Sequence, residues 1–194
     1  VEKLFYGIEQ GILYDDYKRL LVSPPCLKQR ILEEIKRETE RGDEGCICMK
    51  MNSLTDKDVI DSLICASRAG VKILLIIRGI CCLRAGIEGL TDNIRVISIV
   101  GRYLEHSRIY AFGRGEPRVY IGSADMMTRN TTRRIEVMTP VLDPRLIEKL
   151  RDIIELELRD NVKACEMQPD GSYKKIESQG EACDSQIEMY KLYK

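Results

Sequence analysis

The chain of 194 residues has one histidine and no net charge, because 31 Lys and Arg balance 31 Asp and Glu. It has no apolar run near the roughly 20 residues that a membrane-spanning helix needs. Its first residues, "VEKLFYGIEQ", lack the apolar core of a signal peptide. The balanced charge excludes a global field that would attract nucleic acid or an anionic membrane, so any anion site must be local. We expect a soluble protein with no transmembrane segment and no nucleic-acid partner.

The eight cysteines form no C-x-x-C motif, and a single histidine leaves few ligands for zinc. Cys46 and Cys48 alternate in a strand-like run, and Cys65 lies in an apolar helical pattern. Cys81 and Cys82 are adjacent, so their side chains point apart. These positions suit small buried hydrophobic side chains. We predict reduced thiols, a cytosolic location and no metal site in this chain.

The first part of the chain predicts a linker followed by a helix. Residues 1–22 have no strong period, which is typical of a linker or the end of a preceding domain, and the first residue, Val1, is not Met. We therefore expect a piece of a longer chain. Ser23 as N-cap, Pro24 in the first turn and Gly42 as a stop signal predict the helix between them.

A strand, a helix and a second strand are expected next. "CICMKM" (46–51) alternates like a strand, and "TDKDVIDSLICASRAG" (55–70) has Thr55 and Asp58 in capping-box spacing. "VKILLIIRG" (71–79) is an almost unbroken apolar run, which is typical of a strand buried on both faces. This order predicts a right-handed βαβ unit with parallel strands.

The remaining pattern predicts short strands and a long final helix. "GRGEP" joins the middle two strands as a hairpin, and the expected strands are 93–100, 104–112, 118–124 and 133–141. Asp143 caps the helix, Pro144 takes its first position, and an apolar stripe follows that consists of Leu146, Leu150, Ile153, Ile154 and Leu158.

The predicted fold is mixed α+β, a mixed β-sheet flanked by helices in which antiparallel strands follow the βαβ unit. We divide the chain into residues 1–22, a core domain of residues 23–164, and residues 165–194. The last segment is polar and predicts a small hairpin or a docked tail.

The segment "RYLEHSRIYAFGRGEPRVYIGSADMM" (102–127) contains the only histidine. Strand alternation would place His106, Arg108 and Tyr110 on one face. An imidazole can exchange a proton or attack, and a guanidinium can bind phosphate oxygens bidentately, so this pair can bracket a phosphate. In "GSAD", the Ser123 hydroxyl and nearby backbone amides would also face an anion.

Further cationic candidates lie on either side of this segment. Arg78 follows the buried strand directly, and open α/β sheets bind ligands just beyond such strand ends. Arg129, Arg133 and Arg134 make a locally basic rim, with Glu136 on the same face as Arg134. Each feature also has a structural interpretation. His106 could be a hydrogen-bonded structural residue, the arginines a solvated face, and Glu136 a surface partner.

Motifs around these residues resemble those of two known families. H-x-[KR] followed after a hairpin by G-S-x-[ND] resembles half of a phospholipase D-type site, a fold in which two such halves face each other. More narrowly, the segments 78–112, "VYIGSADMMTRN" (119–130) and "RRIEVMTPVLDPRL" (133–146) closely resemble the C-terminal domain of the long bacterial polyphosphate kinases. The resemblance covers residues 20 to about 163, with a looser tail.

The resemblance implies an enzyme that moves the γ-phosphate of ATP reversibly onto inorganic polyphosphate, through a phosphohistidine and with Mg²⁺, in the cytoplasm or at the inner membrane face. Arg78 would contact nucleotide phosphates, together with Arg108 and Ser123. His106 would face the phosphorylated histidine as a proton-transfer partner or phosphate ligand, and Arg134 and Glu136 would belong to the same catalytic cluster. Phosphoryl transfer needs cations around the equatorial oxygens and an acid for the leaving oxygen.

The resemblance also implies partners outside the sequence. The phosphorylated histidine and the magnesium ligands would lie in preceding domains of the same polypeptide, because no second histidine is present. ATP, ADP and polyphosphate would be the ligands, and the parent would be a homo-oligomer. The isolated chain would hold half a site and be inactive.

The sequence departs from both family patterns. The phospholipase D pattern has lysine in place of Arg108, aspartate in place of Gly113 and asparagine in place of Asp125, which weakens a phosphodiesterase interpretation. Among the kinases, a tryptophan usually stands where this chain has Met126. Two alternatives stay open: a phospholipase D-like phosphodiesterase or nuclease that completes its site by dimerising, with His106 as nucleophile, and a non-catalytic polyanion-binding module.

Overall fold

The computed structural model describes residues 1–177 and 180–194. Its helices are α1 (Glu2–Gln10), α2 (Leu27–Thr39), the 3-10 turn η1 (Gly42–Glu44), α3 (Lys57–Arg68), α4 (Thr128–Thr132), α5 (Pro144–Leu158) and α6 (Ser185–Leu192). Its strands are β1 (Leu21–Ser23), β2 (Cys46–Met51), β3 (Lys72–Ile77), β4 (Ile94–Ile99), β5 (Ile109–Phe112), β6 (Arg118–Gly122), β7 (Glu136–Val141), β8 (Ala164–Met167) and β9 (Tyr173–Lys175).

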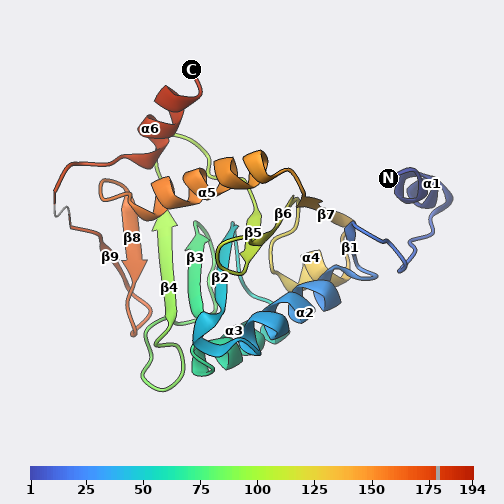
Figure 1. Ribbon diagram of the computed structural model, residues 1–194, viewed down its shortest axis with the longest axis horizontal. Coiled ribbons are helices and arrows are strands. Elements are labelled where there is room, and N and C mark those ends of the chain that lie inside the picture. Colours follow the sequence, from blue (N-terminus) through green and yellow to red (C-terminus); the bar gives the residue numbers. More distant parts are fainter. Residues whose placement is uncertain (178–179) are drawn as a thin grey trace.

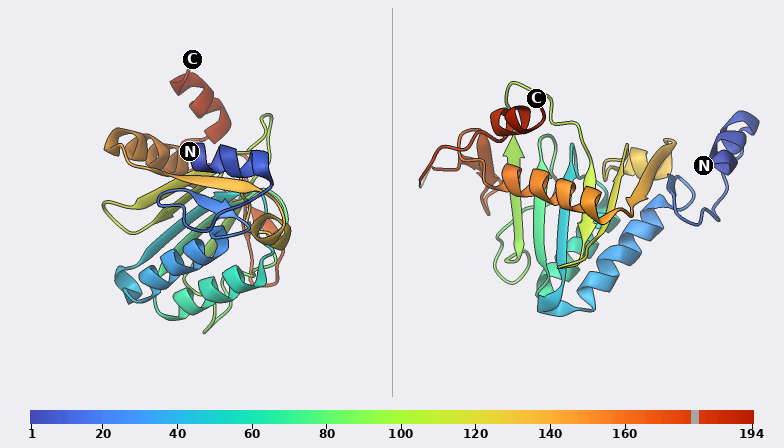
Figure 2. Two further views of the ribbon diagram at one scale, coloured as in Figure 1. Left: turned by 90° about the vertical axis from the view of Figure 1, so that its right-hand side faces the viewer. Right: turned by 45° about the horizontal axis from the view of Figure 1, so that its top comes forward.

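Within these described residues the strands form one nine-stranded sheet in the order β1-β7-β6-β5-β2-β3-β4-β8-β9. β2, β3 and β4 run parallel, and the other neighbouring pairs are antiparallel. Helices α2 and α3 cover one face, and α5 crosses the other (Figures 1 and 2). The predicted mixed fold with a parallel βαβ unit is confirmed. Its parallel part includes β4 as well, because residues 78–93 return along the sheet before β4 begins.

Two apolar clusters fill the spaces between these layers. One lies between the sheet and α2 and α3, and the other lies between the sheet and α5. Alternate residues of β3 enter both: Ile73 and Leu75 belong to the first cluster, and Ile76 belongs to the second. Burial on both faces explains why this strand has an almost unbroken apolar sequence.

Helix α2 begins later than the sequence predicts. Ser23 is not its N-cap, since Cys26 holds that position and Ser23 is the last residue of β1, where it pairs with Glu136. The physical reason is the sheet, because Ser23 pairs with Glu136 in β1 and residues 24–26 form a turn before α2 begins. The Ser23 hydroxyl donates to the carbonyl of Asn130 rather than to a helix amide.

Two other capping predictions have different outcomes. The N-cap of α3 is Asp56, whose carboxylate accepts from the backbone N–H groups of Asp58 and Val59, so the box predicted from Thr55 is wrong by one residue. Asp56 wins because a carboxylate is at least as good an N-cap as a hydroxyl. Asp143 caps α5 with Pro144 at its first position, as predicted.

The C-terminal segment joins the sheet. β8 pairs with β4, and β9 pairs with β8, so the predicted hairpin is present and extends the sheet at that edge (Figure 1). The predicted domain limits fall at strands, one within β1 and one within β8, and the division of the chain into three parts stays a prediction. In the described part of the chain, no helix combines the length and the apolar character that crossing a membrane requires.

Gly122 ends β6, where it pairs with Met138 of β7. A Cβ built there would overlap the carbonyl oxygen of Val137 and lie 2.7 Å from the Cα of Met138. We expect Gly122→Ala to lower the free energy of unfolding by about 2 kcal/mol or more, because backbone atoms must move apart. Urea unfolding of the chain measures the effect.

Gly115 provides the control for this prediction. It has a φ of +73°, and nothing lies within 4 Å of an added Cβ. Gly115→Ala therefore tests conformational strain without overlap, which amounts to about 1 kcal/mol. Equal losses for both variants would contradict the steric explanation.

Candidate functional site

The candidate site lies where several strands begin or end. Asn52 and Arg78 follow the carboxyl ends of the parallel strands β2 and β3, Arg108 directly precedes β5, and Asp125 follows β6. Since β5 is antiparallel to β2 and forms a hairpin with β6, these strand ends meet at one edge of the sheet. Arg78 is half-buried at the rim, which is the predicted position.

The buried carboxylate of Asp125 connects the groups at this edge. It accepts hydrogen bonds from the backbone N–H of Asn52 at 2.7 Å and from the Asn52 side-chain amide at 3.0 Å. The Nε and Nη2 atoms of Arg108 donate to its two oxygens at 3.3 and 3.2 Å. Arg78 Nε donates to Asn52 Oδ1 at 2.6 Å. Two guanidinium groups are therefore held together through one amide and one carboxylate.

His106 is exposed and lies against Arg108. Arg108 Nη1 donates to the carbonyl oxygen of His106 at 2.7 Å and contacts the ring atom Nδ1 at 3.0 Å. The same Nη1 atom lies 3.4 Å from the other ring nitrogen, Nε2, so the guanidinium contacts both nitrogens of the imidazole. The arginine therefore orients a ring that is itself exposed.

The strand predicted to carry His106 is shorter than expected. Pairing with β2 begins at Ile109, opposite Lys50, and residues 104–108 have no regular structure. Strand alternation is thus the wrong reason for placing His106 beside Arg108, because the hydrogen bonds between them bring the two together. Tyr110 does lie within β5, where it is fully buried.

A second polar group forms around Glu136. The Ser123 hydroxyl donates to Glu136 Oε2 and accepts from the backbone N–H of Val137 at 3.2 Å, and Asn130 Nδ2 donates to Glu136 Oε1. The Ser123 N–H donates to the carbonyl of Val137. Glu136 is buried, so its interpretation as a surface partner is wrong.

Tyr110 lies between the two polar groups. Its hydroxyl donates to the carbonyl of Ala124 at 2.7 Å. Burial raises the pKa of Tyr110 well above its ordinary value, and the nearby charges of Asp125 and Glu136 raise it further against the effect of Arg108. Tyr110 is thus a neutral donor that fixes the turn after β6.

The structure does not connect Arg134 to either group. Arg134 is exposed, and among the residues that the structure describes, its guanidinium has no hydrogen bond or ion pair. Asn52 is the residue that the sequence interpretation missed. A signal was available, because Asn52 follows β2 as Arg78 follows β3, and the ends of adjacent parallel strands meet.

The carboxylates of the site do not fit a magnesium ion. Asp125 is engaged by Asn52 and Arg108, and Glu136 is engaged by Ser123 and Asn130. In residues 1–177 and 180–194, no group of three His, Cys, Asp or Glu side chains is arranged to hold a metal.

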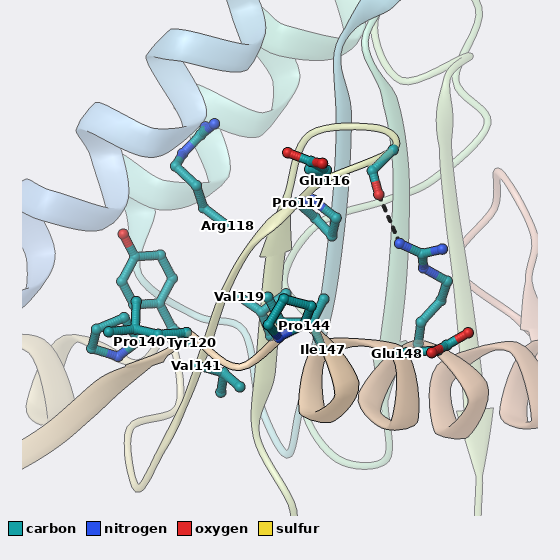
Figure 3. A pocket seen from close by; sticks show the side chains of 13 residues that line it. Glu116, Pro117, Arg118, Val119, Tyr120, Pro140, Val141, Pro144, Ile147 and Glu148 are labelled. Carbon is teal, nitrogen blue, oxygen red and sulfur yellow. Dashed lines mark hydrogen bonds between the residues drawn. The ribbon is translucent and has the colours of Figure 1, made fainter.

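A hollow of about 600 Å³ lies at the other end of the β5–β6 hairpin (Figure 3). Residues near the β5–β6 turn and the start of α5 line it, and Arg151 Nη2 donates to the carbonyl of Gly115 at 2.7 Å. Arg118 borders this hollow, but its charge is balanced by Glu34 and Glu38 at 2.6 and 2.9 Å. The six predicted site residues are not part of its lining, so the candidate site is separate from it.

A buried charge cluster lies directly behind His106. Lys50, which is 2% exposed, forms ion pairs with Glu105 at 2.6 Å and with Glu157 of α5. Burial raises the pKa of Glu157 to about 7, although the charge of Lys50 opposes this shift. Burial also raises the pKa of Glu105, but the hydrogen bond and charge of Lys50 outweigh it and hold that pKa below its ordinary value.

Removing the central carboxylate tests the network around Asp125. We expect Asp125→Ala to lower the free energy of unfolding by about 3 kcal/mol, because it leaves the half-buried Arg108 and the buried Asn52 amide without their partner. Asp61→Ala is the control, since Asp61 is exposed and forms a surface ion pair with Lys57, which predicts a loss of about 0.5 kcal/mol or less. Chemical unfolding measures the free energy of unfolding of both variants. Similar losses would contradict the central role of Asp125 in the hydrogen-bond network.

The raised pKa of Glu157 predicts that the stability of the folded chain depends on pH. Its folded pKa of about 7 lies above its ordinary 4.5, so the folded chain keeps a proton that the unfolded chain loses between these values. Stability should therefore fall as pH rises through this window, with a slope of up to about 1.4 kcal/mol per pH unit. Glu157→Gln removes the titrating group and should flatten the dependence. Urea unfolding from pH 5 to 8 checks this, and an unchanged slope in the variant would contradict it.

Comparison with known proteins identifies the family. The family model described as polyphosphate kinase C-terminal domain 2 matches residues 20–186. A polyphosphate kinase 1 from Chlorobaculum tepidum is 48% identical over 98% of this chain, and a polyphosphate kinase from Synechocystis is 52% identical over 81%. The chain spans 28% and 22% of the lengths of these two relatives.

Solved structures agree with this assignment. The crystal structure of polyphosphate kinase from Porphyromonas gingivalis matches 99% of the chain with a TM-score of 0.92 and 40% identity, and the match covers 30% of that protein. Nuc from Salmonella typhimurium, a phospholipase D family member, matches 71% of this chain and 90% of its own with a TM-score of 0.54 and 17% identity, which shows the fold alone. The chain belongs to the polyphosphate kinase C-terminal domain family.

Proposed function

We propose that the parent protein transfers the γ-phosphate of ATP reversibly to inorganic polyphosphate, and that this chain supplies one half of the site. The supporting observation is the linked series Arg78, Asn52, Asp125, Arg108 and His106. It holds two guanidinium groups and one accessible imidazole together in a chain with no net charge. Phosphoryl transfer depends mainly on positioned cations and a proton donor, which this arrangement offers.

The proposed roles follow from the chemistry of each group. Arg78 and Arg108 bind nucleotide phosphate oxygens, and His106 gives or takes the proton of the leaving oxygen or binds the phosphate. Arg134 adds a mobile cation at the rim, since its side chain is exposed. Ser123 and Glu136 complete the cluster, with the buried Glu136 carboxylate fixing the Ser123 hydroxyl.

The covalent step uses a histidine outside this chain. The bond between the γ-phosphorus and the bridging oxygen breaks, ADP leaves with that oxygen, and a phosphorus–nitrogen bond forms on the second histidine. A terminal oxygen of polyphosphate then forms a bond to this phosphorus, the phosphorus–nitrogen bond breaks, and the second histidine is regenerated. We also propose that magnesium ligands, that histidine and the oligomer contacts belong to preceding parts of a cytoplasmic homo-oligomer.

The two alternatives have less support. A phosphodiesterase needs His106 as nucleophile, and its structural support is a fold similarity at 17% identity. A polyanion-binding module predicts phosphate binding that is sensitive to salt and unaffected by His106→Ala.

Substitutions in the full-length parent test the proposal. We expect His106→Ala to lower kcat for polyphosphate synthesis about 100-fold or more, because it removes proton transfer. Arg78→Ala should raise KM for ATP about 10-fold through a lost phosphate contact. Arg114→Ala is the matched control, since Arg114 is exposed at the hairpin turn and donates to the carbonyl of Asp43. Steady-state kinetics measure all three, and full activity of His106→Ala would contradict the proposal.

A further inference from the structure

The loop that carries His106 has little packing of its own. Val100 and Leu104 are 70% and 71% exposed, and residues 104–108 have no regular structure. A hollow of about 650 Å³ lies between Glu105, Ser107 and Arg108 on one side and α5 and α6 on the other. The ring of Tyr103 stacks on Tyr190 of α6, with centroids 6.3 Å apart, and hydrogen bonds from the same helix fix the backbone of the loop.

Gln186 of α6 makes those hydrogen bonds. It is 4% exposed, its Oε1 accepts from the backbone N–H of Tyr103 at 3.0 Å, and its Nε2 donates to the Tyr103 carbonyl at 2.8 Å. The same Nε2 donates to Glu105 Oε1 at 2.8 Å. The approach is close, since a Cβ at Gly101 would lie 2.5 Å from Gln186 Oε1. The Gln186 side chain thus binds the backbone of Tyr103, three residues before His106, and the side chain of Glu105, which directly precedes His106.

Helix α6 is itself fixed to the end of α5. Asp160 accepts from the backbone N–H of Ser185 at 2.9 Å and from its hydroxyl at 2.6 Å. The backbone N–H of Cys183 donates to Asn161 Oδ1 at 2.8 Å, and the backbone N–H of Asn161 donates to the carbonyl of Cys183 at 3.1 Å. In Figure 1, α6 lies beside α5 above the end of β4, from which the loop departs. Gln186 therefore acts from a supported element.

Glu105 is held from two sides. Its Oε2 accepts from the buried Lys50 of β2, and its Oε1 accepts from Gln186. The residue before His106 is thus clamped between the central sheet and the C-terminal helix. This arrangement restricts the direction in which the following residue can point.

We propose that Gln186 is a positioning residue for His106, which keeps the loop 101–107 in the conformation that phosphoryl transfer requires. The inference deepens the proposed function and depends on it, because it matters only if His106 works in the reaction. It also assigns a role to part of residues 165–194. Misplacement of a reacting group by a small distance is enough to lower a rate strongly.

The test uses the full-length parent with Gln186→Met, which keeps the length of the side chain and removes its hydrogen bonds. Gln168→Met is the matched control, since Gln168 lies in the β8–β9 turn and donates to the carbonyl of Glu166. We expect Gln186→Met to lower kcat about 10-fold with KM for ATP within about twofold, and Gln168→Met to change neither. Unchanged kcat in Gln186→Met would overturn the proposal.

A double-mutant cycle separates positioning from a general structural role. Gln186→Met should cause no further loss of kcat in a His106→Ala background, because it acts through His106. An equal loss in both backgrounds would overturn the inference. Full activity of His106→Ala alone would instead reject the proposed function, which keeps the two failures distinct.

Hydrogen exchange supplies a readout that is independent of activity. The amide of Tyr103 should exchange at least about 10-fold faster in Gln186→Met, while amides of β4 keep their protection. Unchanged exchange at Tyr103 would overturn the inference. If Gln186→Met does not fold, Gln186→Glu removes both donations and keeps the acceptor for the Tyr103 amide, so kcat and the double-mutant cycle decide.

Discussion

The buried carboxylate of Asp125 is the contact on which the site depends. It accepts hydrogen bonds from Asn52, which follows β2, and from Arg108, which precedes β5, while Asp125 itself follows β6. Through Asn52 it also holds Arg78. Two guanidinium groups held this close repel each other, and a buried carboxylate between them offsets that repulsion. The same contact fixes the loops after β2, before β5 and after β6. The order of these strands in the sheet therefore determines which charged groups meet at the site.

This arrangement makes a local cationic edge on a chain with no net charge. Arg78 and Arg108 are held in place, and the exposed imidazole of His106 lies against Arg108. The carboxylates at this edge are all engaged, so the edge suits phosphate oxygens rather than a metal ion. The chain spans 28% of the length of its relative from Chlorobaculum tepidum.

The sequence predicted most of the fold because strong local signals marked it. The apolar run before Arg78 indicated a strand buried on both faces, and Asp143 with Pro144 marked the start of α5. The cap at Ser23 was mispredicted because Ser23 pairs with Glu136 in β1, a contact distant in the sequence that no local capping signal marks. The hydrogen bonds of Asn52 to Asp125 and of Gln186 to Tyr103 join residues 73 and 83 positions apart, and no local pattern marks such pairs.

We propose that His106 works in a site that this chain completes only with another part of its parent. The most direct measurement is transfer of label from γ-labelled ATP with Mg²⁺, using this chain alone and mixed with the preceding part of the parent. We expect label only in the mixture and only on the preceding part of the parent. We expect less label when this chain carries His106→Ala. Label on His106 in the chain alone would contradict it, because this half would then carry the nucleophile.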